Sequence, residues 1–223
     1  MKNILLYTCP LDNKSGGIQN IFLFFDLCRK KGYNIFLCPL LKHIPSLNFF
    51  SPFNNKNLEE ITQKEFDSYY GTDYNKFVVN LKMLKTRDNI VIYTEDVIGN
   101  PSHQNYVVRW LNFFPHPAAV KKYSFEKDYI CFFSNYIFNL YDNLCKNVNM
   151  NNYMHDKIKT PNLLRVFHFD KDIYTDYKNS RKGSCFIVRK GYPPYSFFFS
   201  EKPEILNKLK SKNNMIIKKN KNL

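Results

Sequence analysis

The segment from Asn89 to His116 constrains the fold more than any other part of the sequence. It opens with a short apolar, β-branched run, Ile90 to Tyr93, which is typical of a buried strand in a parallel sheet. The cluster Gly99-Asn100-Pro101 then predicts a sharp loop. From about Ser102 to Phe114, apolar residues recur at helical spacing, which predicts a helix with one buried face. Strand, loop and helix together indicate an α/β unit.

Apolar runs elsewhere in the chain alternate with helical segments in the same way. Further strands are predicted at Ile4–Tyr7, Tyr33–Leu37, Tyr129–Phe133, Leu163–Phe167 and Cys185–Val188. Helices are predicted from Ile18 to Gly32, from Leu58 to Tyr70 and from Asn75 to Leu84, whereas Asn135 to Cys145 gives a mixed pattern. Right-handed crossovers between such strands give a parallel sheet. The sequence therefore predicts an α/β, Rossmann-like fold with a parallel sheet and helices on both faces.

Charge alone is a poor guide to the partner of this chain. The formal net charge of +14 suits a nucleic acid, an anionic phospholipid or a nucleotide diphosphate equally well. Residues 1–100 are nearly balanced, with 12 basic and 10 acidic residues, so the excess lies in the second half and its lysine-rich tail. No helix-turn-helix, zinc or RNP-like pattern is present. A nucleic-acid partner is therefore supported by charge alone.

The six cysteines and five histidines show no spacing typical of a metal site. Because most cysteines lie within apolar runs, we expect reduced, buried thiols and a cytoplasmic protein. No apolar run reaches the length of a signal-peptide core or a membrane span. Any membrane contact would then be peripheral.

Two motifs resemble those of a known enzyme family. Tyr93, Glu95, Gly99-Asn100-Pro101 and the run Val107 to Trp110, in this order and spacing, resemble a motif in the first domain of certain GT-B-type glycosyltransferases. These enzymes serve the synthesis of bacterial and viral surface polysaccharide. The family pattern has proline where this chain has Thr94, and a Pro-Gly pair where it has Pro115 and His116.

The second motif resembles the passage into the donor-binding domain of these enzymes. It runs from Arg181 to Phe186 and continues to Gly191, and the resemblance covers roughly residues 1–192. It implies a Rossmann-like acceptor-side domain at 1–180, followed at 181–223 by a linker, the first strand of an incomplete donor-binding domain and a basic tail. A complete donor domain needs on the order of 100 residues. We therefore expect a truncated second domain.

The resemblance also implies roles for particular residues. Arg189 and Lys190 match the basic pair that meets the diphosphate of the nucleotide-sugar donor, and no metal or other cofactor is expected. Glu95 is the candidate general base or acceptor contact; alternatively, it orients the loop at Gly99 and Asn100.

Further candidates for the acceptor cleft are Gly16, Gly17, Gly99, Asn100, His103 and Arg109. The two glycines precede a predicted helix, where free N–H groups and close backbone approach suit a ligand, although a tight turn explains them equally well. His103 could act as a base or be a simple surface residue. Arg109 could instead pair with Glu95 or Asp96 inside the domain, and Trp110 is expected in the core.

Three functions are compatible with the sequence. The first is a glycosyltransferase, or its acceptor-side half, acting on a glycan or lipid-linked acceptor. The second is a non-catalytic truncated domain that binds a partner polypeptide, such as a separately encoded donor domain. The third, supported by charge alone, is a basic nucleic-acid-binding protein.

Overall fold

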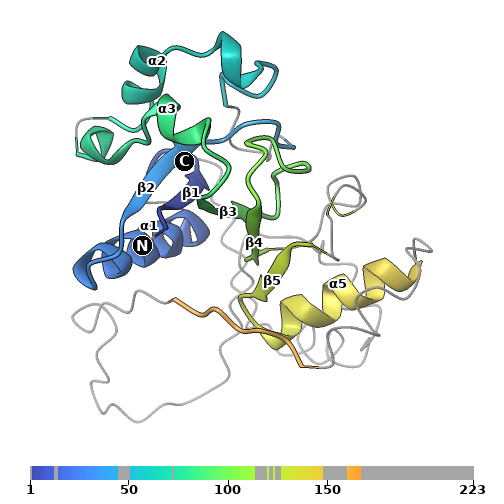
Figure 1. Ribbon diagram of the computed structural model, residues 1–223. Coiled ribbons are helices and arrows are strands. Elements are labelled where there is room, and N and C mark those ends of the chain that lie inside the picture. Colours follow the sequence, from blue (N-terminus) through green and yellow to red (C-terminus); the bar gives the residue numbers. More distant parts are fainter. Residues whose placement is uncertain are drawn as a thin grey trace, which may run out of the picture. The chain divides into compact units, whose positions relative to one another are not determined.

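The computed structural model describes residues 2–12, 15–44, 51–71, 73–113, 120, 123, 127–147 and 160–166. The chain divides into two units, Met1–Thr175 and Asp176–Leu223, and all described residues belong to the first. Five strands form one parallel sheet in the order β2-β1-β3-β4-β5 (Figure 1). Their bounds are β1 Ile4–Thr8, β2 Ile35–Pro39, β3 Ile90–Thr94, β4 Tyr106–Leu111 and β5 Tyr129–Phe132.

Helices cover both faces of this sheet. The long helix α1 (Gly16–Lys30) lies on one side of β1 and β2, and α2 (Gln63–Asp67) and α3 (Leu81–Leu84) lie on the other (Figure 1). The 3₁₀ turns η1 (Leu58–Glu60) and η2 (Asn75–Phe77) belong to the same covering segment, and α5 (Asn135–Asn147) follows β5. The fold is therefore α/β and Rossmann-like, as predicted.

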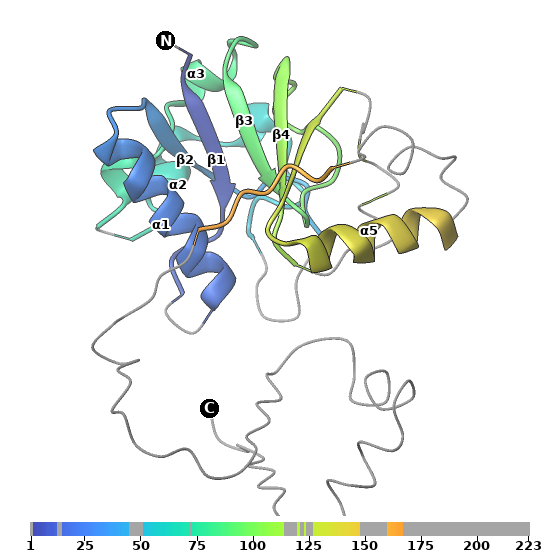
Figure 2. The ribbon, with the colours of Figure 1, turned by 90° about the horizontal axis from the view of Figure 1, so that it is seen from below.

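Successive side chains of a strand point to opposite faces of the sheet, so neighbouring residues of each strand pack into different hydrophobic cores. On one face, Tyr7 and Tyr93 pack with residues of the 51–84 segment, such as Phe66. On the other face, Leu6 and Trp110 pack against α1, and the segment 160–166 crosses the sheet there (Figure 2). A third cluster joins the end of the sheet at β5 to α5.

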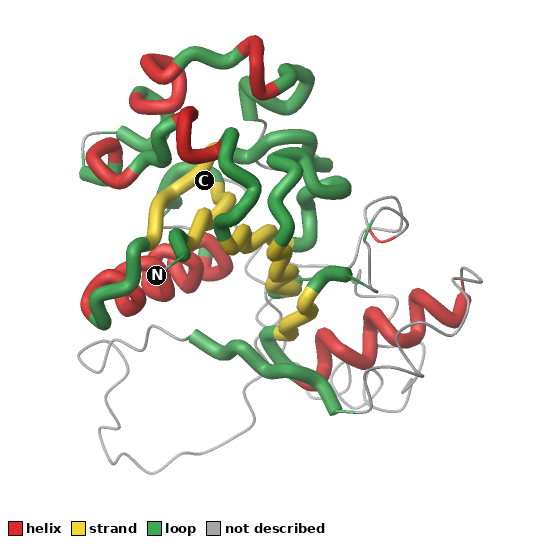
Figure 3. Tube along the Cα trace, viewed as in Figure 1, coloured by secondary structure: helices red, strands yellow, loops and turns green. Residues whose placement is uncertain are grey.

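The predicted helix from Ser102 to Phe114 is wrong. Residues 106–111 form β4 instead, in parallel register with β3, and the connection before it is a loop (Figure 3). The apparent helical spacing came from two adjacent apolar pairs, at 106–107 and 110–111. A strand buried on both faces contains such pairs too, so apolar periodicity alone does not distinguish the two structures. Trp110 is fully buried, as predicted.

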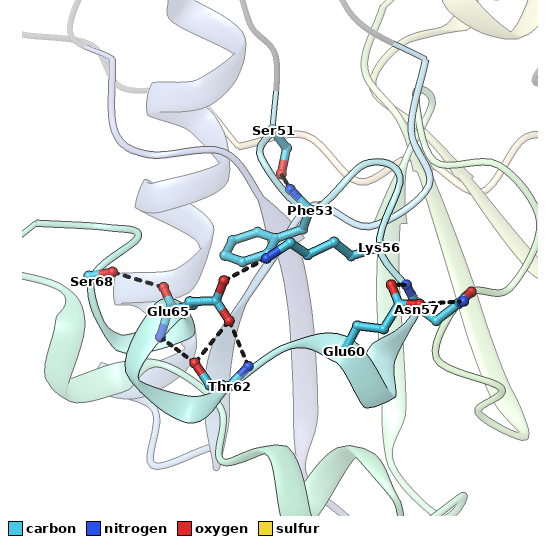
Figure 4. A network of polar contacts seen from close by, with 8 residues as sticks. All are labelled: Ser51, Phe53, Lys56, Asn57, Glu60, Thr62, Glu65 and Ser68. Carbon is cyan, nitrogen blue, oxygen red and sulfur yellow. Dashed lines mark hydrogen bonds and ion pairs between the residues drawn. The ribbon is translucent and has the colours of Figure 1, made fainter.

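Two other predicted helices are broken into short pieces. The side chain of Thr62 accepts a hydrogen bond from Glu65 N, and that of Asn80 accepts one from Lys82 N, so each residue starts a new helix. Figure 4 shows that the carboxylate of Glu65 accepts a hydrogen bond from the backbone N–H of Thr62, which completes a capping box, and forms an ion pair with Lys56.

The remaining strand predictions differ from the structure in detail. The strand predicted from Tyr33 begins at Ile35, and the mixed segment from Asn135 is a helix. Around Leu163 the structure has an isolated bridge to Phe132, rather than a strand. Phe167 and the predicted strand Cys185–Val188 lie outside the described residues. Among the described residues, no helix is long and apolar enough to cross a membrane.

Candidate functional site

The strand order indicates that a ligand site would lie at the carboxyl ends of β1 and β3. The chain leaves β1 towards β2 on one side and returns to β3 on the other, so the sheet changes winding direction between β1 and β3. In open parallel sheets, ligands bind beyond the carboxyl ends of the strands at such a switch point. The described segments that emerge there are residues 9–12 and 15–17 after β1 and residues 95–98 after β3.

Gly16 and Gly17 are the first two residues of α1, which follows β1. Within the described residues, Ser15 makes no side-chain cap to this helix, and its first turn contains no acidic residue. The first N–H groups of a helix have no partner inside the helix and lie at the positive end of its dipole. A Cβ atom on Gly17 would have no atom within 4 Å, so the position borders open space.

Glu95 directly follows β3 and is 9% exposed. Its Oε2 accepts a hydrogen bond of 3.0 Å from the backbone N–H of Asn112, which directly follows β4. The hydroxyl of Tyr123 donates to the backbone carbonyl of Glu95. Burial, reinforced by the charge of Asp96, raises the pKa of the Glu95 carboxyl to about 8. A carboxyl group with this pKa can give up or take a proton near neutral pH.

Among the described residues, the bonds that hold the glycine-containing loop come from Tyr93, Asn100 and Arg109 and not from the Glu95 carboxylate. The hydroxyl of Tyr93 donates to Asn100 Oδ1 at 2.9 Å, and Asn100 Nδ2 donates to the carbonyl of Gln104 at 2.8 Å. Gly99 has a φ of 65°, a conformation that glycine adopts without a steric cost. Asn100 therefore uses its amide inside the loop.

Arg109 is 1% exposed and uses its guanidinium inside the domain. Its Nε donates to Asp128 at 2.6 Å, and Nη1 and Nη2 donate to the carbonyls of Val97 and Gly99. In the described part of the chain, its ion pair is thus with Asp128 rather than with Glu95 or Asp96. The bonds tie β4 to the loop after β3, which is a structural role.

His103 lies away from Glu95. It is exposed, with a φ of 53°, in a turn in which its N–H donates to the carbonyl of Asn100. The next residue, Gln104, accepts a hydrogen bond from Asn89 N, just before β3. His103 is therefore near the amino end of β3, whereas Glu95 follows its carboxyl end; five residues of strand span about 16 Å. The structure does not bring these two together.

His43 is a residue near the switch point that sequence reasoning missed. It follows β2, is buried, and forms an antiparallel bridge with Val97, two residues beyond Glu95. Its backbone N–H donates to Asn54 Oδ1, and burial lowers the pKa of its imidazole. The signal in the sequence was a histidine among the apolar residues of the segment Leu40 to Ile44. Asn112 was missed as well, because its segment was predicted to be a helix.

Arg189 and Lys190 lie outside the described residues, so their predicted contact with a donor diphosphate stays a prediction. Within the described residues, no group of three or more histidine, cysteine or acidic side chains could hold a metal ion. The five described cysteines are free thiols, and all except Cys28 are buried.

The arrangement at the carboxyl ends of β1 and β3 thus combines a glycine-rich helix start with a buried carboxyl group of raised pKa. This combination could position a polar ligand and exchange a proton with it. Comparison of the chain with protein-family models, curated proteins and solved structures finds no significant match.

Proposed function

We propose that this chain is a GT-B-type glycosyltransferase, or the acceptor-side half of one, which transfers a sugar from a nucleotide-sugar donor to a glycan or lipid-linked acceptor. The observation that carries the proposal is the position of Glu95: a nearly buried carboxyl group directly after β3, at the switch point of a parallel sheet. The motif that contains Glu95 resembles the acceptor domain of these enzymes.

In this proposal Glu95 acts as the general base. Its carboxylate takes the proton from an acceptor hydroxyl as the hydroxyl oxygen bonds to the anomeric carbon of the donor sugar. The bond from that carbon to the diphosphate breaks, and the diphosphate leaves. The raised pKa makes the carboxylate a stronger base than that of an exposed glutamate.

Positive groups near the leaving diphosphate would stabilise the charge that develops on it. Arg189 and Lys190 supply them in this proposal. Separately, the first N–H groups of α1, at Gly16 and Gly17, lie at the positive end of the helix dipole and would favour an anionic group of a ligand. The open space beside Gly17 supports close approach of a ligand to this backbone.

A thermal-shift screen against nucleotide sugars and free nucleoside diphosphates tests the proposal, because a ligand that binds only the folded state raises its melting temperature. We expect a shift for the wild-type chain that is lost in the Arg189→Ala, Lys190→Ala variant. Glu95→Gln should keep the shift but abolish transfer to an acceptor, since it retains shape and loses the base. If none of the nucleotides raises the melting temperature, the chain is not a complete enzyme. That result would favour the acceptor-side half, a domain that needs a partner.

A further inference from the structure

The amino ends of the strands bring together cations that are scattered in the sequence. We define the amino edge as residues 2–3, 29–34, 85–89, 105–106 and 127–129, which lie at or just before the first residues of the five strands. In Figure 2 these ends point to the top of the view, where the N label marks the start of the chain. The amino edge contains seven lysine and arginine residues but only two aspartates.

The two aspartates neutralise little of this charge. The side chain of Asp128 is 5% exposed and is paired with Arg109, which is not one of the seven. Asp88 is exposed and pairs with Lys2. Among the described residues, the other six cations form no ion pair, and all six are exposed. The folded chain thus has a basic edge even though its first 100 residues are nearly neutral in sum.

Three exposed tyrosines lie along the same edge. Tyr33 is 49% exposed, Tyr106 47% and Tyr129 58%. Val108 pairs with Tyr129, so Tyr106 and Tyr129 lie on the same face of neighbouring strands with an offset of two residues, about 8 Å apart. The ammonium of Lys2 lies 3.5 Å from the ring centre of Tyr106. An aromatic ring and a cation thus lie side by side at the ends of these strands.

We propose that the amino edge binds single-stranded nucleic acid. Cations that release counterions from phosphates, combined with exposed aromatic rings on which bases stack, are the means by which proteins hold single strands. Five strands span about 19 Å from the first to the last, a width that fits a few nucleotides. The exposed asparagines Asn34 and Asn105 add amide groups to this edge, which can bond to base edges.

This surface is independent of the proposed sugar-transfer site. Glu95 follows the carboxyl end of β3, and the amino edge lies at the opposite ends of the same strands. A failure of either proposal therefore leaves the other standing. The linear sequence had no nucleic-acid motif, because the cations and tyrosines come from five separate segments that meet only in the sheet.

Fluorescence anisotropy of the full chain with a labelled single-stranded oligouridine of about 20 nucleotides tests this inference. We expect Tyr106→Ala and Tyr129→Ala each to raise the dissociation constant at least about fivefold, the weakest effect seen for loss of one stacked base. Tyr136→Ala, on α5 and 52% exposed, is the matched control and should change nothing. Tyr106→Phe retains the ring and should retain binding.

The contribution of the cations to nucleic-acid binding is tested separately. Arg87→Ala should reduce the slope of log affinity against log salt concentration by about 0.7, whereas Lys64→Ala, an exposed cation on α2, should leave it unchanged. An abasic oligomer of equal charge should bind at least about fivefold more weakly, because it cannot stack. Equal binding of the abasic oligomer, stronger binding to phosphatidylserine vesicles, or no binding at low salt would each overturn the proposal.

Discussion

Replacement of Arg109 by methionine should be among the most destabilising changes in this chain. Methionine fills a similar volume but removes three donors, those to Asp128 and to the carbonyls of Val97 and Gly99. It also leaves the carboxylate of Asp128 buried without its partner. Breaking a buried pair in this way costs about 3–5 kcal/mol. Because a typical domain is stable by about 5–15 kcal/mol, a loss of this size removes between about a fifth and nearly all of the stability.

Urea unfolding followed by the fluorescence of Trp110 measures this cost directly, because Trp110 is the single tryptophan and is fully buried. The Asp128→Asn variant and the double variant complete a double-mutant cycle. We expect the double variant to be more stable than the sum of the two single effects predicts, by about 1–3 kcal/mol, because the second change removes the orphaned charge.

A loss below about 1 kcal/mol for Arg109→Met would refute the reasoning, since surface ion pairs contribute no more than that. Additive single effects would also refute it, because they would mean that Arg109 and Asp128 do not interact. Arg109→Lys is a useful further variant. Lysine keeps the charge but cannot reach three acceptors in different directions as a planar guanidinium does, so it should recover only part of the loss.

Single contacts lead to three further predictions. Hydrogen bonds from Lys56 and Thr62 lower the pKa of the Glu65 carboxyl to about 2 (Figure 4). The difference in unfolding free energy between wild type and Glu65→Gln should therefore be constant above about pH 5. It should vanish as the pH falls towards 2, where the carboxyl is protonated in both the folded and the unfolded chain. Gly17→Ala should raise stability by up to about 1 kcal/mol, as read by urea unfolding, because the added methyl group enters open space on a helix. Glu95→Gln should gain stability relative to wild type as the pH rises from 4.5 to about 8 in thermal melts, because burial opposes ionisation of the glutamate.

The sign of the Glu95 prediction follows from linkage. Its pKa is raised in the folded state, so the folded chain holds a proton that the unfolded chain releases above its ordinary pKa of 4.5. Wild-type stability therefore falls between pH 4.5 and about 8 on account of this group, and glutamine, which does not titrate, removes that fall. A wild type and variant with parallel stability from about pH 5 to 9 would show that the Glu95 carboxyl is not buried as described.

Short β-branched runs between breakers are enough to locate most of the strands from the sequence alone. Ile4–Tyr7 and Ile90–Tyr93 correspond to β1 and β3 with shifts of one residue at most, because a short apolar run that is bounded on both sides has few alternatives to a buried strand. The helix after β1 is likewise evident from its amphipathic spacing and the glycine at its end. These features are local, so the amino-acid sequence by itself determines them.

Features that depend on strand pairing and on contacts between distant segments were decided only by the tertiary structure. The same apolar spacing suited a helix or a doubly buried strand at 106–111, and only pairing with β3 and β5 selected the strand. The partner of Arg109 is 19 residues away, and His43 meets Val97 across two different loops. The basic amino edge likewise exists only after five segments are aligned by the sheet, because hydrogen bonding between strands brings together charges that are distant in the chain.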